Sequence, residues 1–261
     1  MFARICERRC RKNKRIVIPE EGLCVHDRLK EYFVAQPWQT IEKADTADGV
    51  LELRKRGERD FLILINNRVL MNSSANRSEL ALGELACREV AARPRPRVLI
   101  GGLGMGLTLR AALDPLPAIA RVVVAEINPA VITWCRGPLA ELNKKAADDP
   151  RVFVMNDDVA AVIAEAAGPS NERYDAIIID LYEGPHAGTD AANDPFYGSR
   201  ALKKTAAALS SGGIFAVWGE AADTAFEKRL RAAGFTVNVQ RPGRGGLRHV
   251  VYVAQTPDAS S

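Results

Sequence analysis

Several acidic residues stand where a predicted strand ends, and their side chains are the first candidates for chemistry. They are Glu126, Asp157, Asp158 and Asp180, and each follows a short apolar run. In an open parallel sheet the carboxyl ends of the strands line a crevice that binds a ligand. A carboxylate in such a crevice accepts hydrogen bonds from hydroxyl and amino groups and can take up a proton. The pattern predicts a nucleoside site with a proton acceptor beside it.

A glycine-rich loop precedes the first of these acids. It contains Gly101, Gly102, Gly104 and Gly106. Glycines let a backbone turn tightly and approach a ligand closely. Glu126 ends the next predicted strand, where an acidic side chain accepts hydrogen bonds from both hydroxyls of a ribose. This combination binds NAD in some proteins and S-adenosylmethionine in others. The alternative for the loop is a tight turn that binds no ligand.

The adjacent aspartates after the third predicted strand have two possible roles. An acidic side chain there can accept a hydrogen bond from the amino group of adenine, and we expect Asp157 to do so. The same place also caps the helix predicted from Val159 onward. One aspartate can fill each role, so Asp157 and Asp158 both count as predicted cofactor-binding residues.

Two acids separated by an aromatic residue follow the fourth predicted strand. Asp180 and Glu183 should face the group that is transferred, because they follow the carboxyl end of that strand. There they can hold an amine by charge-assisted hydrogen bonds and accept the proton that it loses. Tyr182 stacks on a substrate or covers the crevice. Structural capping of the loop is the alternative for both acids.

Alternating strands and helices must position these residues. From Arg97 onward, short apolar runs are separated by segments with helical spacing, such as Leu103–Leu113 and Pro129–Leu142. This alternation predicts a doubly wound parallel sheet of the α/β class. Near the end, Phe235–Gln240 and Arg248–Ala254 flank a Gly-rich link, so the last strand should run antiparallel to its neighbour. Such a strand in a seven-stranded sheet is typical of the methyltransferase variant of the Rossmann-like fold.

A smaller sheet is predicted ahead of the large one. The runs Trp38–Lys43, Val50–Arg54 and Phe61–Ile65 alternate with turn signals, and a helix is predicted over Arg77–Ala92. The prolines that follow disfavour helix and mark a domain junction. We expect four parts: a basic arm at 1–37, the small β domain with its helix at 38–96, a cofactor-binding catalytic domain at 97–256 and a tail at 257–261.

Charge and composition exclude several classes of partner. Of the formal net charge of +4, the segment from Arg4 to Arg15 supplies +6, from seven basic residues against Glu7. The remainder is therefore about −2 (4 − 6), so we expect no nucleic-acid partner, and contact of the arm with RNA or a membrane surface is the alternative to a solvated tail. No apolar run reaches the ~18 residues that span a bilayer, so we expect no membrane partner.

The five cysteines and three histidines predict no metal site. The cysteines are odd in number and lack paired spacing, which fits a reducing cytoplasm better than a disulfide framework. His186 follows the loop of Asp180 and could support it, whereas His249 lies in a predicted strand and is expected to be a packed residue.

Several motifs together resemble one family. They are the glycine loop with its strand, Val124–Asn128, Asp149–Val152, Asp157, Tyr174–Asp180, Phe196-Tyr197 and Leu209–Gly213. They resemble the spermidine synthase (polyamine synthase) family of the class I S-adenosylmethionine-dependent fold, over roughly residues 38–254. The resemblance implies that Glu126 binds the ribose, Asp157 binds the adenine and Asp180 accepts the amine proton. It also implies a homodimer.

Three positions depart from the family pattern. Gly104 stands where the family usually has an aspartate that pairs with the ammonium of decarboxylated S-adenosylmethionine. An aspartate would repel the carboxylate of the intact donor, so its absence favours methyl transfer. Ser78–Glu84 replaces a helix with a Tyr-His pair, and Asp180–Pro185 replaces an Asp-Ser-Ser-Asp-Pro loop.

We therefore expect transfer of a methyl group from S-adenosylmethionine to a small, amine-type acceptor, with Asp180 as the base. Aminopropyl transfer from the decarboxylated donor is the alternative. A nucleoside-binding module without turnover is a second alternative, which the retention of both Asp180 and Glu183 disfavours. An NAD-dependent oxidoreductase is disfavoured by the predicted C-terminal hairpin.

Overall fold

The computed structural model describes residues 36–169, 172–242 and 249–258. Almost all of the predicted basic arm, and most of the Gly-rich link before the last strand, lie outside these residues. Within the described ranges we find no helix with the length and apolarity that a membrane span requires.

The first sheet is a four-stranded antiparallel meander. Its strands lie in chain order as β1 (Gln39–Thr46), β2 (Gly49–Arg56), β3 (Asp60–Ile65) and β4 (Arg68–Asn72). Asn66 and Asn67 make the turn between β3 and β4 with φ of 46° and 66°, a left-handed conformation that asparagine tolerates. Leu53 and Ile63 pair across β2 and β3 and are buried. The predicted small sheet is confirmed.

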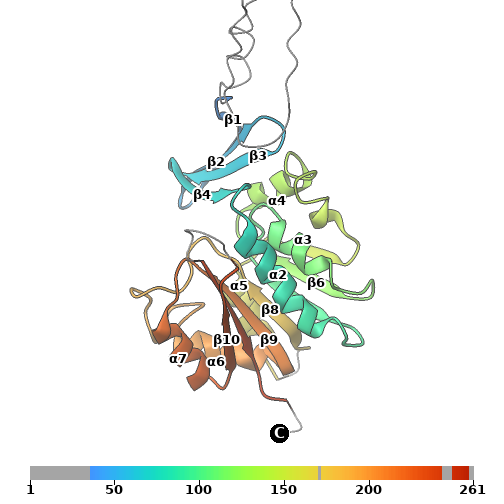
Figure 1. Ribbon diagram of the computed structural model, residues 1–261, viewed down its shortest axis with the longest axis vertical. Coiled ribbons are helices and arrows are strands. Elements are labelled where there is room, and N and C mark those ends of the chain that lie inside the picture. The colour runs from blue at the N-terminus through green and yellow to red at the C-terminus, as the bar shows by residue number, and fades with distance from the viewer. Residues whose placement is uncertain (1–35, 170–171, 243–248, 259–261) are drawn as a thin grey trace, which may run out of the picture. The chain divides into compact units, whose positions relative to one another are not determined.

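A seven-stranded sheet forms the centre of the rest of the chain (Figure 1). Its spatial order is β10 (Thr236–Gln240), β11 (Val250–Gln255), β9 (Leu209–Gly219), β8 (Tyr174–Ile179), β5 (Arg97–Gly101), β6 (Arg121–Ala125) and β7 (Val152–Met155). Strands β5, β6, β7, β8 and β9 run parallel to one another, and β11 is antiparallel to both β9 and β10. The predicted doubly wound sheet with an antiparallel terminal strand is confirmed.

Helices cover both faces of this sheet. One face packs against α2 (Arg77–Val90), α3 (Leu107–Leu113) and α4 (Pro129–Arg136), and the other against α5 (Val159–Ala166), α6 (Ser199–Ala208) and α7 (Thr224–Ala232). Successive residues of β5 alternate between them: Val98 and Ile100 point to the first face, and Leu99 points to the second. Burial on both faces explains why the strands read as continuous apolar runs.

Two helices are shorter than their sequence pattern predicts, and glycines explain both differences. The helix expected from Leu103 begins at Leu107, because Gly104 and Gly106 adopt left-handed φ values of +51° and +77°. The helix expected to run from Pro129 to Leu142 ends at Arg136, because Gly137 caps it with a non-helical backbone. The first difference matters most, since it leaves the glycine loop as an open turn.

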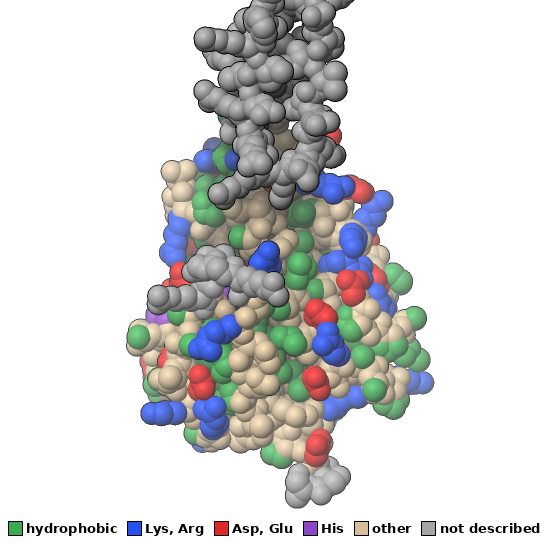
Figure 2. Space-filling model, in the orientation of Figure 1, with side chains coloured by type: hydrophobic (Ala, Val, Ile, Leu, Met, Phe, Trp, Pro, Cys, Tyr) green, Lys and Arg blue, Asp and Glu red, His purple; other side chains and the backbone are tan. Residues whose placement is uncertain are grey.

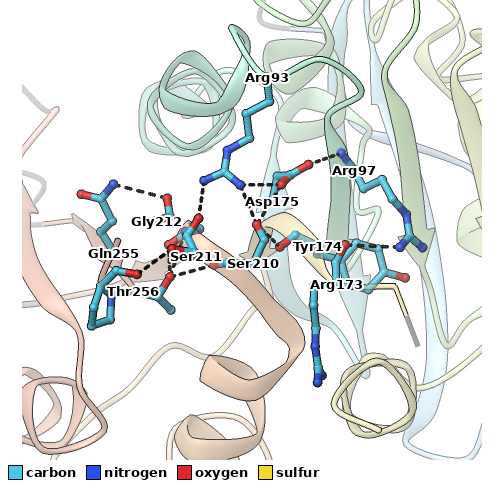
Figure 3. A network of polar contacts seen from close by, with 12 residues as sticks. Arg93, Arg97, Arg173, Tyr174, Asp175, Ser210, Ser211, Gly212, Gln255 and Thr256 are labelled. Atoms are coloured by element: carbon cyan, nitrogen blue, oxygen red, sulfur yellow. Dashed lines mark hydrogen bonds and ion pairs between the residues drawn. The ribbon is translucent and has the colours of Figure 1, made fainter. Parts of the chain in front are cut away.

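A polar network joins the segments at the amino end of the parallel strands (Figure 3). The Asp175 carboxylate accepts hydrogen bonds from Arg93 Nη1 at 2.6 Å, Ser210 Oγ at 2.8 Å and the Arg97 backbone nitrogen at 2.9 Å. Arg93 also donates to the carbonyl oxygen of Ser211. Asp175 therefore links the segment after α2 to β5 and β9 at the end of the sheet away from the predicted site.

Candidate active site

A cavity opens at the carboxyl ends of β5, β6, β7 and β8, and we call it the central cavity. Its volume is about 340 Å³. The small sheet contributes part of its wall, through Asp48, Leu70 and Met71. The described wall contains no lysine, arginine or histidine, but it contains five carboxylates: Asp48, Glu126, Asp157, Asp158 and Asp180. Apolar surface with convergent acids suits a ligand that combines a flat ring, hydroxyl groups and positive charge.

The loop glycines divide into two groups. Gly102 and Gly104 line the central cavity, with φ of +89° and +51°. Gly101 and Gly106 do not line it, and their lack of a side chain serves packing instead. A Cβ on Gly101 would lie 2.7 Å from the Val159 side chain, and one on Gly106 would lie 2.9 Å from Asn143 Nδ2.

Glu126 is a buried acid in the cavity wall with 6% of its surface exposed. Its Oε2 atom accepts a hydrogen bond of 2.8 Å from the backbone nitrogen of Leu103, and Oε1 accepts one of 2.8 Å from Asn128. Each carboxylate oxygen has a second lone pair available for a ligand. The acid predicted to bind a ribose thus also holds the glycine loop in place.

Asp157 and Asp158 both line the central cavity. Asp158 caps α5, because its carboxylate accepts from the backbone nitrogen of Ala160 at 2.8 Å. Asp157 Oδ1 accepts from the backbone nitrogen of Asp158 at 2.8 Å, and Asp157 is exposed. The capping role therefore belongs to Asp158, and Asp157 is the better placed of the two to meet a ligand.

Asp180 lies in the cavity wall with an unusual proton affinity. Burial, reinforced by the negative charge of Glu79, raises the pKa of Asp180 to about 7, against the opposing effect of a hydrogen bond. That bond is donated by the hydroxyl of Thr108 to Asp180 Oδ2 at 2.5 Å. A carboxylate with a pKa near neutrality can take a proton from a bound group and release it again.

Glu183 lies outside the central cavity, in a neighbouring depression that we call the side groove. The side groove has a volume of about 650 Å³ and also includes Glu220, Asp223 and His249 in its wall. Tyr182 lines both the groove and the cavity and is 57% exposed. The two predicted acids are therefore not together: Asp180 faces the cavity, Glu183 faces the groove, and Tyr182 stands at the boundary.

Sequence reasoning missed one residue in the cavity wall, Asp48, and two that contact wall residues, Thr108 and Asn156. Asp48 lies in the turn between β1 and β2, Thr108 lies in α3, and Asn156 follows β7. Asn156 Nδ2 donates hydrogen bonds of 2.8 Å to the carbonyl oxygens of Glu126 and Ile127. Asn156 could have been found from its place directly after a predicted strand. Asp48 and Thr108 carry no such signal, because only the packing of other elements brings Asp48 to the cavity and Thr108 to Asp180.

Charges do not gather into a region of one sign on the face drawn in Figure 2. There, among the described residues, lysines and arginines are interspersed with aspartates and glutamates. The same part of the chain holds no group of three or more histidines, cysteines, aspartates or glutamates arranged to bind a metal ion.

The sheet order, with its antiparallel terminal strand and a ligand cavity at the strand ends, defines the class I S-adenosylmethionine-dependent transferase fold. Solved spermidine synthases share this fold. One of them, from Thermotoga maritima, superposes with a TM-score of 0.60 and 17% identity, covering 83% of this chain and 72% of that one. Another, a spermidine synthase in complex with the transition-state analogue AdoDATO, gives a TM-score of 0.61 and 16% identity.

The family model "Spermine/spermidine synthase domain" matches residues 87–230, more than half of the 261 residues, so this chain belongs to that family. A polyamine aminopropyltransferase of Mycobacterium tuberculosis is 32% identical over 179 residues, which are 63% of this chain and 33% of that protein. One from Sodalis glossinidius is 27% identical over 200 residues, 73% of this chain and 62% of that protein. The matched region thus spans about a third of the first relative and less than two thirds of the second.

These findings contradict the prediction of methyl transfer. The family model is that of spermine and spermidine synthases, and the matching curated relatives are polyamine aminopropyltransferases. The interpretation of Gly104 as a sign of methyl transfer was wrong, since the family and the named relatives are those of spermine and spermidine synthesis. The Gly104 backbone is left-handed with φ of +51°, which glycine adopts without strain, and a Cβ there would lie 2.5 Å from Met71 Sδ unless that side chain moved. The glycine suits the shape of the loop.

Proposed function

We propose that this chain transfers the aminopropyl group of decarboxylated S-adenosylmethionine to an amino group of a polyamine-type acceptor. The observation that carries the proposal is Asp180, a carboxylate with a pKa raised to about 7 in an acidic cavity beside an acidic groove. Membership in the spermine/spermidine synthase family and the names of the curated relatives support the same reaction.

The central cavity would hold the nucleoside donor. Glu126 would accept hydrogen bonds from the ribose hydroxyls with its remaining lone pairs, and Asp157 would accept from the amino group of adenine. Gly102 and Gly104 leave room for the ligand beside the loop. The decarboxylated donor carries a sulfonium and an ammonium but no carboxylate, so an acidic wall without a described basic residue attracts it.

Asp48 is well placed to pair with the donor's ammonium group. It lines the central cavity from the β1–β2 turn, and we find no hydrogen bond or ion pair for its carboxylate within the described part of the chain. The small sheet would thus supply a carboxylate that the glycine loop lacks at Gly104.

The side groove would hold the acceptor. Polyamines are cations at neutral pH, and Glu183 and Glu220 give the groove wall two carboxylates beside Arg68. A third wall carboxylate, Asp223, caps α7 and is paired with Arg229 at 3.8 Å. Tyr182 at the boundary offers an aromatic face to the acceptor's methylene chain or ammonium group. We propose the cavity and the groove as one continuous site, with the reacting groups meeting near Asp180.

The reaction would be an in-line displacement at carbon. The neutral amino nitrogen of the acceptor attacks the aminopropyl carbon bonded to the sulfonium, so a C–N bond forms as the C–S bond breaks. The sulfur keeps the electron pair of the broken bond and becomes the thioether of 5′-methylthioadenosine. Asp180 takes the proton that the amine loses, while the remaining residues contribute mainly by alignment of the two reactants.

A direct assay tests this proposal. The protein is incubated with decarboxylated S-adenosylmethionine and a diamine or triamine, and mass spectrometry follows the extended polyamine and 5′-methylthioadenosine. Asp180→Asn should lose about 100-fold to 10,000-fold in rate, as expected for a lost general base, while donor binding persists. If no polyamine is extended by the wild-type protein, the proposed function is wrong.

Asp180→Asn should also change stability in a pH-dependent way. The pKa of Asp180 is about 7 in the folded protein, above its value in the unfolded chain, so the protonated form of this carboxyl group stabilises the folded state relative to the ionised form. Its contribution to stability is fully present below the ordinary pKa of 3.8 and is lost as the pH rises from there to about 7. Thermal unfolding should therefore show that Asp180→Asn gains more stability relative to wild type at pH 8 than at pH 5. An equal difference at both pH values would contradict this origin of the effect.

A homodimer, a cytoplasmic location and the four-part division of the chain stay predictions. Within that division we propose that residues 97–256 carry the donor-binding sheet, and that residues 38–96 complete the cavity through Asp48 and Met71.

A further inference from the structure

A histidine in the side groove is held by a short chain of hydrogen bonds. His249, just before β11, is partly buried and lines the groove. Its Nδ1 atom lies 3.1 Å from the hydroxyl oxygen of Ser78 in α2. The Ser78 hydroxyl in turn donates to Glu79 Oε2 at 2.7 Å.

The order of these bonds sets the ring's protonation pattern. A carboxylate can only accept, so the single hydroxyl proton of Ser78 points to Glu79. The Ser78 oxygen must then accept from His249, which places a proton on Nδ1. In the neutral ring the other nitrogen, Nε2, is therefore an acceptor.

His249 Nε2 has no hydrogen-bonding partner among the described residues, although the ring itself is fixed. The Trp218 ring packs edge-on against it, with a centroid distance of 5.0 Å and an interplanar angle of 75°. The hydrogen bond with Ser78 and the ring contact with Trp218 restrain the imidazole from two different elements, α2 and β9. A fixed acceptor in the wall of an acidic groove is suited to a ligand that donates hydrogen bonds and carries positive charge.

Glu79 also connects this histidine to the proposed base. The backbone carbonyl of Glu79 lies 3.3 Å from the Thr108 hydroxyl, which is the group that donates to Asp180. His249, Ser78, Glu79, Thr108 and Asp180 thus form one connected series of contacts. A group held by His249 is held on the same framework that positions the proton acceptor.

We infer that His249 is a specificity residue for the acceptor, and that its Nε2 atom accepts a hydrogen bond from an amino group of the polyamine in the side groove. The inference rests on the proposed function for the chemical class of the ligand. Ser78 and Glu79 are positioning residues that act through the ring.

Calorimetric titration with 1,4-diaminobutane, in the presence of 5′-methylthioadenosine, tests this contact. His249→Asn keeps a nitrogen donor near the Nδ1 position and removes the Nε2 acceptor. It should weaken diamine binding by about tenfold, the effect of one hydrogen bond to a charged group, with 5′-methylthioadenosine affinity unchanged. His249→Gln, whose longer amide reaches the Nε2 position, should recover part of the loss. Glu84→Gln on the exposed side of α2 is the matched control and should bind as wild type does.

The outcomes separate the inference from the function on which it rests. Diamine affinity of His249→Asn within twofold of wild type would overturn the inference, even if the wild-type protein makes extended polyamines. Diamine binding that depends on His249, in a wild-type protein that transfers no aminopropyl group, would support the contact and refute the proposed reaction. A wild-type protein that binds no diamine overturns both.

Discussion

At the scale of single residues, Thr108 is the group that most directly adjusts the proposed base. Its hydroxyl donates to Asp180 at 2.5 Å and favours the ionised carboxylate, against the burial that raises the pKa of Asp180. Thr108→Val keeps the shape and removes the donor. The lost bond is worth about 1 kcal/mol, a little under one pKa unit, so the pKa of Asp180 should rise further.

The measurement is the pH profile of kcat/KM for aminopropyl transfer. The base must be ionised to act, so the rate should rise with pH through about 7 in the wild-type protein and through a higher pH in Thr108→Val. Thr205→Val, at a buried threonine of α6 that contacts the Ala201 carbonyl, is the control and should keep the wild-type midpoint. An unshifted midpoint in Thr108→Val would contradict the role of the hydroxyl.

Residue types alone identified part of this site. Glu126, Asp157, Asp158 and Asp180 could be placed in one crevice because each follows a predicted strand, and all four line the central cavity. Thr108 and Glu79 could not be predicted, since they come from helices whose side chains reach Asp180 only after packing. Gly104 misled the prediction of the donor, because a glycine that suits a left-handed backbone and a glycine that replaces a carboxylate look the same in a sequence.

At the scale of elements, the network around Asp175 should hold the amino ends of the strands together (Figure 3). Its carboxylate is largely buried and accepts from Arg93, Ser210 and the Arg97 backbone. Asp175→Ala leaves three donors without their acceptor and should reduce the free energy of unfolding by about 2–3 kcal/mol in urea titrations. Glu172→Gln removes an exposed ion-pair partner of Arg97 and should change it by less than about 0.5 kcal/mol. Equal effects of the two substitutions would mean that Asp175 does not bridge these segments.

The elements themselves were predictable to different degrees. The strands of both sheets could be read from apolar runs between turn signals, including the antiparallel arrangement of the last one. The ends of α3 and α4 could not, because helical spacing continues through Gly104, Gly106 and Gly137, whose backbone angles end or delay the helix. The packing of His249 was predicted but its contact with Ser78 of α2 was not, since the two residues are 171 positions apart in the sequence.

At the scale of the whole molecule, the central cavity belongs to both sheets. Asp48, Leu70 and Met71 of the small sheet face the strand ends of the large one across it. A ligand that contacts both walls stabilises both, because it binds the folded state alone. Hydrogen exchange should therefore show that 5′-methylthioadenosine protects the β1–β2 turn and β4 as well as the glycine loop. Protection confined to residues 97–256 would contradict a shared cavity.

The order of strands also bears on how the chain is made. β11 follows β10 in the chain but lies between β10 and β9, pairing antiparallel with both. During synthesis β10 leaves the ribosome before β11, and β10 can join the sheet only through β11. The edge of β9 that will pair with β11 is therefore unpaired until β11 has been made. Such edges attract other unfinished chains. The segment that contains β11 also carries His249 to the groove, so the nascent protein pairs the edge of β9 and completes its proposed acceptor site in one late step.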